Sequence, residues 1–180
     1  AQDLSETMND AKSLLLKIIM CIGLVVEEHG NSARASRLFE SLRPTADKLL
    51  MSDPSDVAYL PFLVLVGAYR FLANEEILCW RTIGQVARHC IELGLHRRHT
   101  TSRIQDDEVR RNAIHSFWTA YILDRRWSFA TGLPYVLQDG DIDSHLPPPV
   151  RKPFLSPFLT PRGPADADFS RTSSLSYSPW

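Results

Sequence analysis

The chain has 180 residues, of which 44% are apolar, enough for one domain with a hydrophobic core. Its formal net charge is −1, so it has no overall positive field to hold a phosphate backbone, and we expect no direct nucleic-acid binding by this segment. The three cysteines, Cys21, Cys79 and Cys90, are too scattered for a disulfide framework and indicate a reduced intracellular protein.

An apolar run over residues 14–26 raises the question of a membrane segment. Lys17 interrupts the run, which is shorter than the roughly 20 residues that a span needs. Acidic Glu27 and Glu28 follow it, and no basic start or cleavage site of a signal peptide is present. We therefore predict a buried helix and no membrane contact.

Helical periodicity predicts an all-α fold of about five helices in an irregular bundle. The first helix covers residues 5–28 and the third begins near 52–54; because both are apolar nearly all round, we expect both to be central. The second, residues 32–49, has one apolar stripe and a break at Pro44, so we expect it to lie at the periphery.

The fourth helix is predicted over residues 75–93, and its end has a clear signal. Gly94 can serve as the residue after the C-cap, with Leu95 covering the helix end. Gly84 and Ala87 offer a shallow surface on which a neighbouring helix can approach closely.

A fifth helix is announced by Ser and Thr at 100–102 and by acidic residues at 106–108, and we expect it to reach about Ala130. Its stripe has helical spacing and consists of Ile114, Phe117, Trp118, Tyr121 and Ile122. We assign residues 1–147 to this helical domain. Residues 148–180, rich in Pro and Ser, are predicted to form a disordered tail.

Ordered motifs recur between the fourth helix and the tail. They are Trp80, Gly84 and Ala87; Leu93 to Arg97; Arg110 and Arg111; Phe117 to Tyr121; Leu123 to Arg125; Gly132 to Pro134; and Asp141 to Pro147. In order and spacing they resemble the fungal-specific transcription factor domain, the middle homology region of zinc binuclear cluster transcription factors. The candidate motif residues are Trp80, Gly84, Gly94, Leu95, His96, Arg97, Arg111, Phe117, Trp118, Asp124, Arg125, Gly132 and Pro134.

The resemblance implies a nuclear regulatory domain whose parent factor binds DNA through a zinc cluster outside this chain. Its expected partners are other domains, co-regulators, a second copy of the chain or a small-molecule effector. Two features depart from the family pattern. Leu133 stands where a basic residue is usual, and a Pro/Ser-rich stretch follows Pro147 where further helices are usual. We therefore interpret the chain, which begins at Ala1, as a partial domain and a piece of a longer protein.

No metal or cofactor site is expected in this chain. A binuclear zinc cluster needs six closely spaced cysteines, and His96 and His99 with Cys90 lack further ligands. The aspartates at 139, 141 and 143 imitate a calcium loop, but Ser144 stands where that loop needs glycine. We expect turn or capping roles for them.

We also predict that the segment is not an enzyme, since it has no nucleophile motif and no Gly-rich phosphate loop. The aromatic residues Trp80, Phe117, Trp118, Tyr121 and Trp127 are interpreted as core. The alternative is a free-standing helical ligand-binding protein or enzyme that uses this aromatic face as its pocket.

Two further expectations concern charge and exposed surface. If Asp124 is buried it needs a partner, and since Arg111 is about 20 Å away along the helix, we expect Arg88 or Arg97 to pair with it. Arg97, Arg98 and Arg103 are interpreted as cations at a helix end. Five helices offer too few neighbours to cover the first and third helices, so some apolar surface should remain open.

Overall fold

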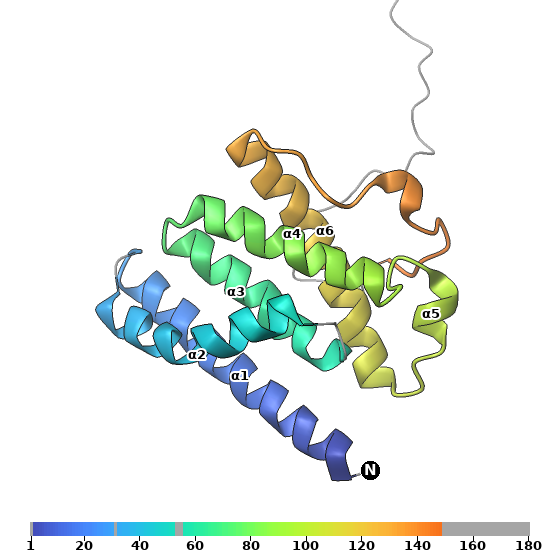
Figure 1. Cartoon of the computed structure of the whole chain (residues 1–180), viewed down its shortest axis with the longest axis horizontal. Helices are drawn as coiled ribbons and strands as arrows, with labels where there is room; N and C mark the ends of the chain where they lie inside the picture. The colour runs from blue at the N-terminus through green and yellow to red at the C-terminus, as the bar shows by residue number, and fades with distance from the viewer. Residues whose placement is uncertain (1, 31, 53–55, 149–180) are drawn as a thin grey trace, which may run out of the picture. The chain divides into compact units, whose positions relative to one another are not determined.

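The computed structural model describes residues 2–30, 32–52 and 56–148, all within the first of two units into which the chain separates after Pro149. The described residues form α1 (Gln2–Glu27), α2 (Ala33–Met51), α3 (Leu60–Leu72), α4 (Glu76–Glu92), α5 (Arg98–Ser102) and α6 (Asp107–Thr131), with short 3-10 turns η1 (Val57–Tyr59) and η2 (Asp139–Asp141) (Figure 1). No strand occurs among them, so the predicted all-α fold is confirmed. Residues 149–180 of the predicted tail lie outside the described residues.

The centre of the bundle is α3, which packs against α1, α4 and α6, while α2 packs mainly against α1 (Figure 1). The buried residues of α3 point in every direction around that helix: Leu60, Phe62, Leu63, Val64, Val66, Tyr69 and Arg70. The expectation of a central third helix and a peripheral second helix is confirmed. That arrangement leaves α1 with neighbours on one side only.

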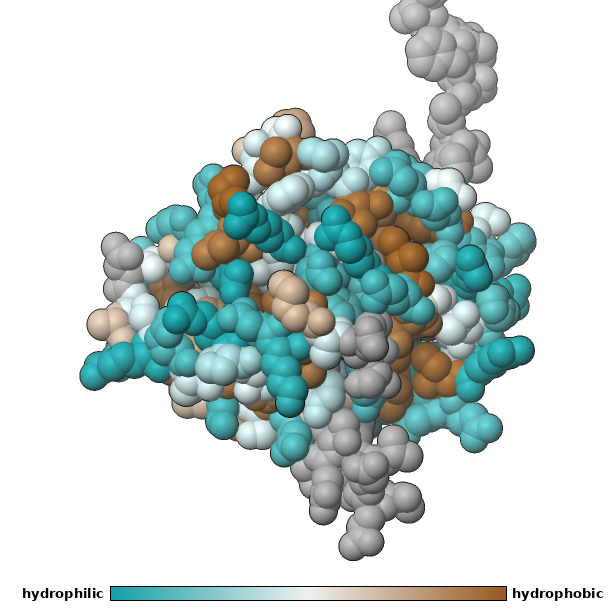
Figure 2. Space-filling model, viewed as in Figure 1, coloured by the Kyte–Doolittle hydropathy of each residue, from teal (hydrophilic) through white to brown (hydrophobic). Residues whose placement is uncertain are grey.

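The outer face of α1 corrects the expectation that the first helix is central. Leu16, Ile19, Met20 and Val26 are all at least half exposed, whereas Ile18, Cys21 and Val25 are buried against the core. The apolar surface expected to remain open therefore lies on α1 and not on α3. On the face shown in Figure 2, hydrophilic colour predominates, with apolar patches among it.

The structure corrects the predicted course of two helices. The fifth predicted helix is two helices, because Asp106 starts α6 afresh: its carboxylate accepts hydrogen bonds from the backbone N–H groups of Glu108 and Val109 at 2.8 and 2.9 Å. Pro44 does not break α2, which continues to Met51. The buried face of α2, with Phe39, Leu42, Ala46 and Leu50, holds the helix together on both sides of the proline.

The end of α4 follows the prediction. Gly94 has φ +69°, and its N–H donates to the Ile91 carbonyl, while the Leu95 N–H donates to the Cys90 carbonyl, both at 2.9 Å. These two bonds form a Schellman motif, and the buried Leu95 side chain covers the helix end. Gly132, also at φ +69°, ends α6 in the same left-handed conformation.

The close helix approach lies at a different glycine from the one predicted. A Cβ at Gly67 of α3 would lie 2.8 Å from Ile83 Cγ1 of α4, and closer still to its Cδ1, so the Ile83 side chain would have to shift to admit a larger residue. A Cβ at Gly84 would meet only Val136 Cγ2 at 3.5 Å and Arg88 Nη1 at 3.7 Å, which are ordinary contacts. The closest approach of α3 to an α4 side chain at a glycine is therefore at Gly67 and not at Gly84.

Candidate functional site

Most of the predicted motif residues meet around one segment, residues 133–148, which we call the strap. It follows α6 and runs back beside α4 and α6 toward α5 (orange in Figure 1). Leu137 and Leu146 of the strap are buried in the main core. The strap is thus an integral part of the bundle although it contains only one short 3-10 turn.

Asp124 of α6 is the buried anchor of the strap. Its Oδ2 accepts hydrogen bonds from the backbone N–H groups of Val136 and Leu137 at 2.7 and 2.8 Å. Burial raises the pKa of the Asp124 carboxyl, while these two bonds and the charges of Arg125 and Arg88 act to lower it. The carboxylate therefore recognises backbone amides of the strap.

The expected ion pair between Asp124 and an arginine of residues 88–98 is wrong. Within the described residues, no arginine nitrogen lies within 4.0 Å of its carboxylate, although Arg88 is near enough for its charge to act on the pKa. The strap amides supply donors to Oδ2 alone, and Oδ1 is buried without a hydrogen-bond partner among the described residues.

Arg125 joins the strap to α6 from the solvent side. Its Nη1 donates to the Leu137 carbonyl at 3.0 Å, and its Nη2 pairs with the Asp139 carboxylate. The Tyr121 hydroxyl donates to the same Asp139 oxygen at 2.7 Å. The Arg125 guanidinium also lies 3.9 Å above the Tyr121 ring and 4.6 Å from the ring of Tyr135, so several weak contacts reinforce one another.

Two tryptophans hold the ends of the strap. Trp80 Nε1 of α4 donates to the Pro134 carbonyl at 3.2 Å, and Trp118 Nε1 of α6 donates to the Pro147 carbonyl at 2.8 Å. Phe117 is fully buried and meets the Trp118 ring edge to face at 5.3 Å. Phe117 therefore belongs to the core, and Trp80 and Trp118 donate hydrogen bonds to the strap.

The last turn of the strap is fixed to the connection between α4 and α5. Asp143 donates its N–H to the His96 carbonyl at 3.0 Å, and its carboxylate accepts from the backbone N–H groups of Arg98 and His145 at 3.2 and 2.9 Å. The expected turn or capping role is confirmed for Asp143. Burial, followed by the neighbouring Arg97 charge, lowers the pKa of the His96 ring.

Arg111 is the predicted motif residue that lies apart from the strap. It is exposed near the start of α6, where its charge helps the amides of Val109 and Glu108 to lower the pKa of Asp106. Gly94 and Leu95 shape the end of α4, and Gly84 lies under Val136 of the strap. The main residues that sequence reasoning missed are Val136 and Leu137, whose backbone groups carry no sequence signal.

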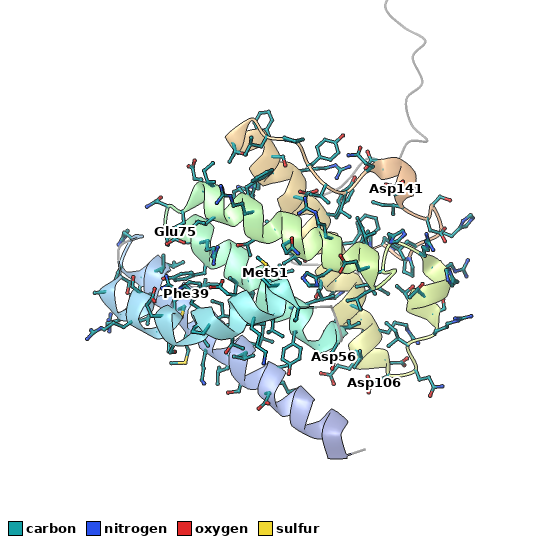
Figure 3. The ribbon with its side chains drawn as sticks, in the orientation of Figure 1. Phe39, Met51, Asp56, Glu75, Asp106 and Asp141 are labelled. Carbon is teal, nitrogen blue, oxygen red and sulfur yellow. The ribbon has the colours of Figure 1, made fainter. Side chains whose placement is uncertain are left out.

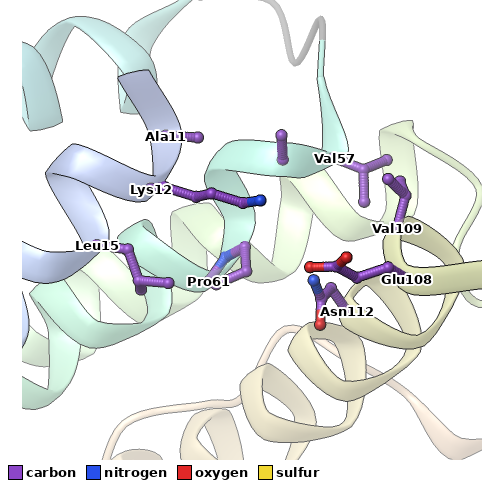
Figure 4. A pocket seen from close by; sticks show the side chains of 9 residues that line it. Ala11, Lys12, Leu15, Val57, Pro61, Glu108, Val109 and Asn112 are labelled. Atoms are coloured by element: carbon purple, nitrogen blue, oxygen red, sulfur yellow. The ribbon is translucent and has the colours of Figure 1, made fainter. Parts of the chain in front are cut away.

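Among the hollows between the described helices are three, none of which is lined by Phe117, Trp118, Tyr121 or Trp127. The smallest, about 100 Å³, lies between α1, η1 and α6, where Lys12 and Glu108 project toward each other (Figure 4). A second, about 250 Å³, lies between the strap and the end of α4, beside His96. The third and largest, about 330 Å³, lies between α2 and α4.

The part of the chain that the structure describes has neither a metal-ligating cluster nor a membrane-spanning helix. There, no group of three or more His, Cys, Asp or Glu side chains is placed to hold a metal ion. None of the described helices is both long and apolar enough to cross a membrane.

The family model of the fungal specific transcription factor domain matches residues 2–156. The chain belongs to this family. The match extends the sequence resemblance, which rests on motifs between Trp80 and Pro147, back to the start of α1. In this fungal specific transcription factor domain, the strap and the helices that it joins all fall within the matched residues.

Three similar proteins come from the yeast Schizosaccharomyces pombe, and each bears the description of an uncharacterized transcriptional regulatory protein. The one called C530.05 is 29% identical over 147 residues, which are 79% of this chain and 18% of the relative. Another is 30% identical over 145 residues, 77% of this chain and 22% of the relative. The chain thus spans about a fifth of the length of these relatives. No solved structure gives a significant match.

Proposed function

We propose that residues 1–147 form a regulatory domain of a fungal zinc-cluster transcription factor that acts in the nucleus and does not itself contact DNA. The family match and the transcriptional regulatory proteins among the relatives support this role. The zinc cluster that binds DNA belongs to a part of the factor outside this chain. The domain controls transcription through contacts with other domains, with co-regulators, with a second copy or with a small-molecule effector, and it performs no catalysis.

The observation that carries the proposal is how the motif residues use their polar groups. Asp124 binds two strap amides, Trp80 and Trp118 bind two proline carbonyls, and Arg125 binds a carbonyl and Asp139. A catalytic site keeps such groups free for a substrate. Here the polar groups of the motif bind the strap, so the motif has a structural role. Regulation then depends on the surfaces of the folded domain that contact its partners.

A tethering experiment tests the proposal. The full chain is fused to an unrelated DNA-binding domain that has its sites upstream of a reporter gene, and reporter output is compared with that of the DNA-binding domain alone. We expect the chain to change the output, and we expect Asp124→Ala, which removes the acceptor of two strap amides, to weaken the change. Arg103→Gln, on an exposed residue away from the strap, is the matched control. Equal output from the fusion and the DNA-binding domain alone contradicts the proposal.

A further inference from the structure

The largest of these three hollows is a cleft between the C-terminal end of α2 and one face of α4, with Val136 of the strap at its border. Its volume is about 330 Å³. Three arginines line it, Arg70 from α3 and Arg81 and Arg88 from α4, against one carboxylate, Asp47 from α2. The side chains that line the cleft therefore carry a net charge of about +2, in a chain whose total formal charge is −1.

Arg70 is the buried cation of the cleft, and its charge is only partly compensated. Its side chain is 10% exposed, and its Nη2 lies 3.5 Å from an oxygen of Asp47, whose own side chain is 55% exposed. Arg70 Nε is buried without a hydrogen-bond partner among the described residues. Because a buried guanidinium is costly unless it is paired and hydrogen-bonded, an anion in the cleft would stabilise it.

Arg81 and Arg88 add two exposed guanidinium groups on the same face of α4. They are seven residues apart, so their Cα atoms are separated by about 10.5 Å along the helix axis. Over the described part of the chain, no carboxylate oxygen lies within 4.0 Å of either guanidinium. Guanidinium groups bind carboxylate and phosphate in a two-pronged geometry, so this pair is suited to an anionic ligand.

The rest of the lining is mostly apolar. Leu50, Met51, Leu78 and Trp80 surround the cations together with Val136. Met51, labelled in Figure 3 at the end of α2, is 82% exposed, and Leu78 is also exposed. A volume of about 330 Å³ is in the range of small-molecule sites, which combine apolar walls with a few polar groups that orient the ligand.

We propose that this cleft binds a small organic anion, with its carboxylate on the arginines and an apolar body against Met51, Leu78 and Trp80. The inference rests on the proposed regulatory function, for which it names the class of effector. Such a ligand contacts α2, α4 and Val136 of the strap at the same time. Its binding therefore couples the end of α2 to the strap, to which the motif residues are hydrogen-bonded.

Calorimetric titration of the full chain with 2-naphthoate, an aromatic carboxylate of suitable size, tests the proposal. We expect one site, and binding weaker by at least about tenfold for the neutral 2-naphthalenemethanol and for the double variant Arg81→Gln/Arg88→Gln, because each loses charge-assisted hydrogen bonds. Arg103→Gln should bind like the original chain. Since Arg81, Arg88 and Arg103 are all exposed, unchanged circular dichroism is expected of every variant.

Several outcomes overturn the proposal: no heat at about 1 mM 2-naphthoate, equal binding of the neutral alcohol, or a double variant that binds as well as the original chain. Tighter binding of hexaglutamate than of 2-naphthoate also overturns it, because the occupant is then an acidic peptide. The tethering experiment separates this inference from the proposed function. A chain that changes reporter output but does not bind 2-naphthoate keeps the function and loses the effector class.

Discussion

Gly67 and Gly84 both lie inside helices, but only Gly67 touches another helix. Gly67→Ala places a methyl group against the Ile83 side chain and should destabilise the fold by about 1–3 kcal/mol. Gly84→Ala has ordinary room and removes a helix-interior glycine, so it should stabilise by up to about 1 kcal/mol. Urea denaturation of both variants measures the two changes. Effects of the same sign would contradict the close approach at Gly67.

Asp124 supports a second prediction at the residue scale. Asp124→Ala leaves the amides of Val136 and Leu137 without their acceptor, and the free energy of unfolding should fall by about 2–4 kcal/mol. Asp124→Asn keeps one acceptor oxygen and should lose less. Arg88→Ala should cost under about 1 kcal/mol, since Arg88 is exposed and makes no ion pair with Asp124. Equal losses in the Arg88 and Asp124 variants would instead indicate a buried ion pair.

The raised pKa values of the cysteines give a prediction about thiol reactivity. Burial raises the pKa of Cys79 and Cys90 to about 12 and also raises that of Cys21. All three are therefore thiols at pH 8, and all three are buried. Native protein should not react rapidly with Ellman's reagent at this pH, whereas protein unfolded in guanidinium should release three equivalents. One rapidly reacting equivalent in the native state would contradict the burial of that cysteine.

At the scale of single elements, α2 carries a proline in its interior without a break. Pro44 gives up one backbone hydrogen bond and crowds the preceding turn, so Pro44→Ala should stabilise the protein by about 1–3 kcal/mol. Thermal and urea unfolding measure the gain, and Pro61→Ala, at the start of α3 where proline is tolerated, is the matched control. A loss of stability at position 44 would mean that Pro44 sets a bend required by the packing of α2.

The helices show which features a sequence can predict. The ends of α4 and α6 depend on local signals, Gly94, Gly132 and the Asp106 cap, and these positions are recognisable without any tertiary contact. The predicted break at Pro44 and the predicted central position of α1 are both wrong, because tertiary packing decides these two features. Buried residues on both sides of Pro44 keep α2 continuous, and too few neighbouring helices reach α1. Helical periodicity reports which faces are apolar, but it does not report which faces find a partner.

The strap shows what a sequence alone conceals. Its motif residues were recognisable through the family resemblance, and Asp124 was correctly expected to need a partner. The partner itself is a pair of backbone N–H groups 12 and 13 residues away, and every residue except proline has such a group. Arg70 had a sequence signal, a single cation within the apolar stretch of α3, but the cleft beside it requires α2 and α4 to be placed in space.

At the scale of the whole molecule, the outer face of α1 is an apolar surface that the described residues leave open. Leu16, Ile19 and Met20 form one stripe, and a Cβ at nearby Gly23 would meet nothing within 4 Å. We expect the full chain to bind a hydrophobic dye or to self-associate in sedimentation runs. Replacing these three residues with Glu should reduce both effects and change stability little, because they pack against few neighbours. A monomer that binds no dye would contradict the exposure of this face.

The strap also bears on the order in which the molecule assembles. The hydrogen bond from Trp80 to Pro134 joins residues 54 positions apart, whereas α3 and α4 are neighbours in the sequence and can pack early. The amides of Val136 and Leu137 find Asp124 only after α6 has formed. We therefore expect the strap to dock last and to detach first by local unfolding. In that open form the cleft between α2 and α4 has lost Val136 from its border, so docking of the strap and filling of the cleft should favour each other.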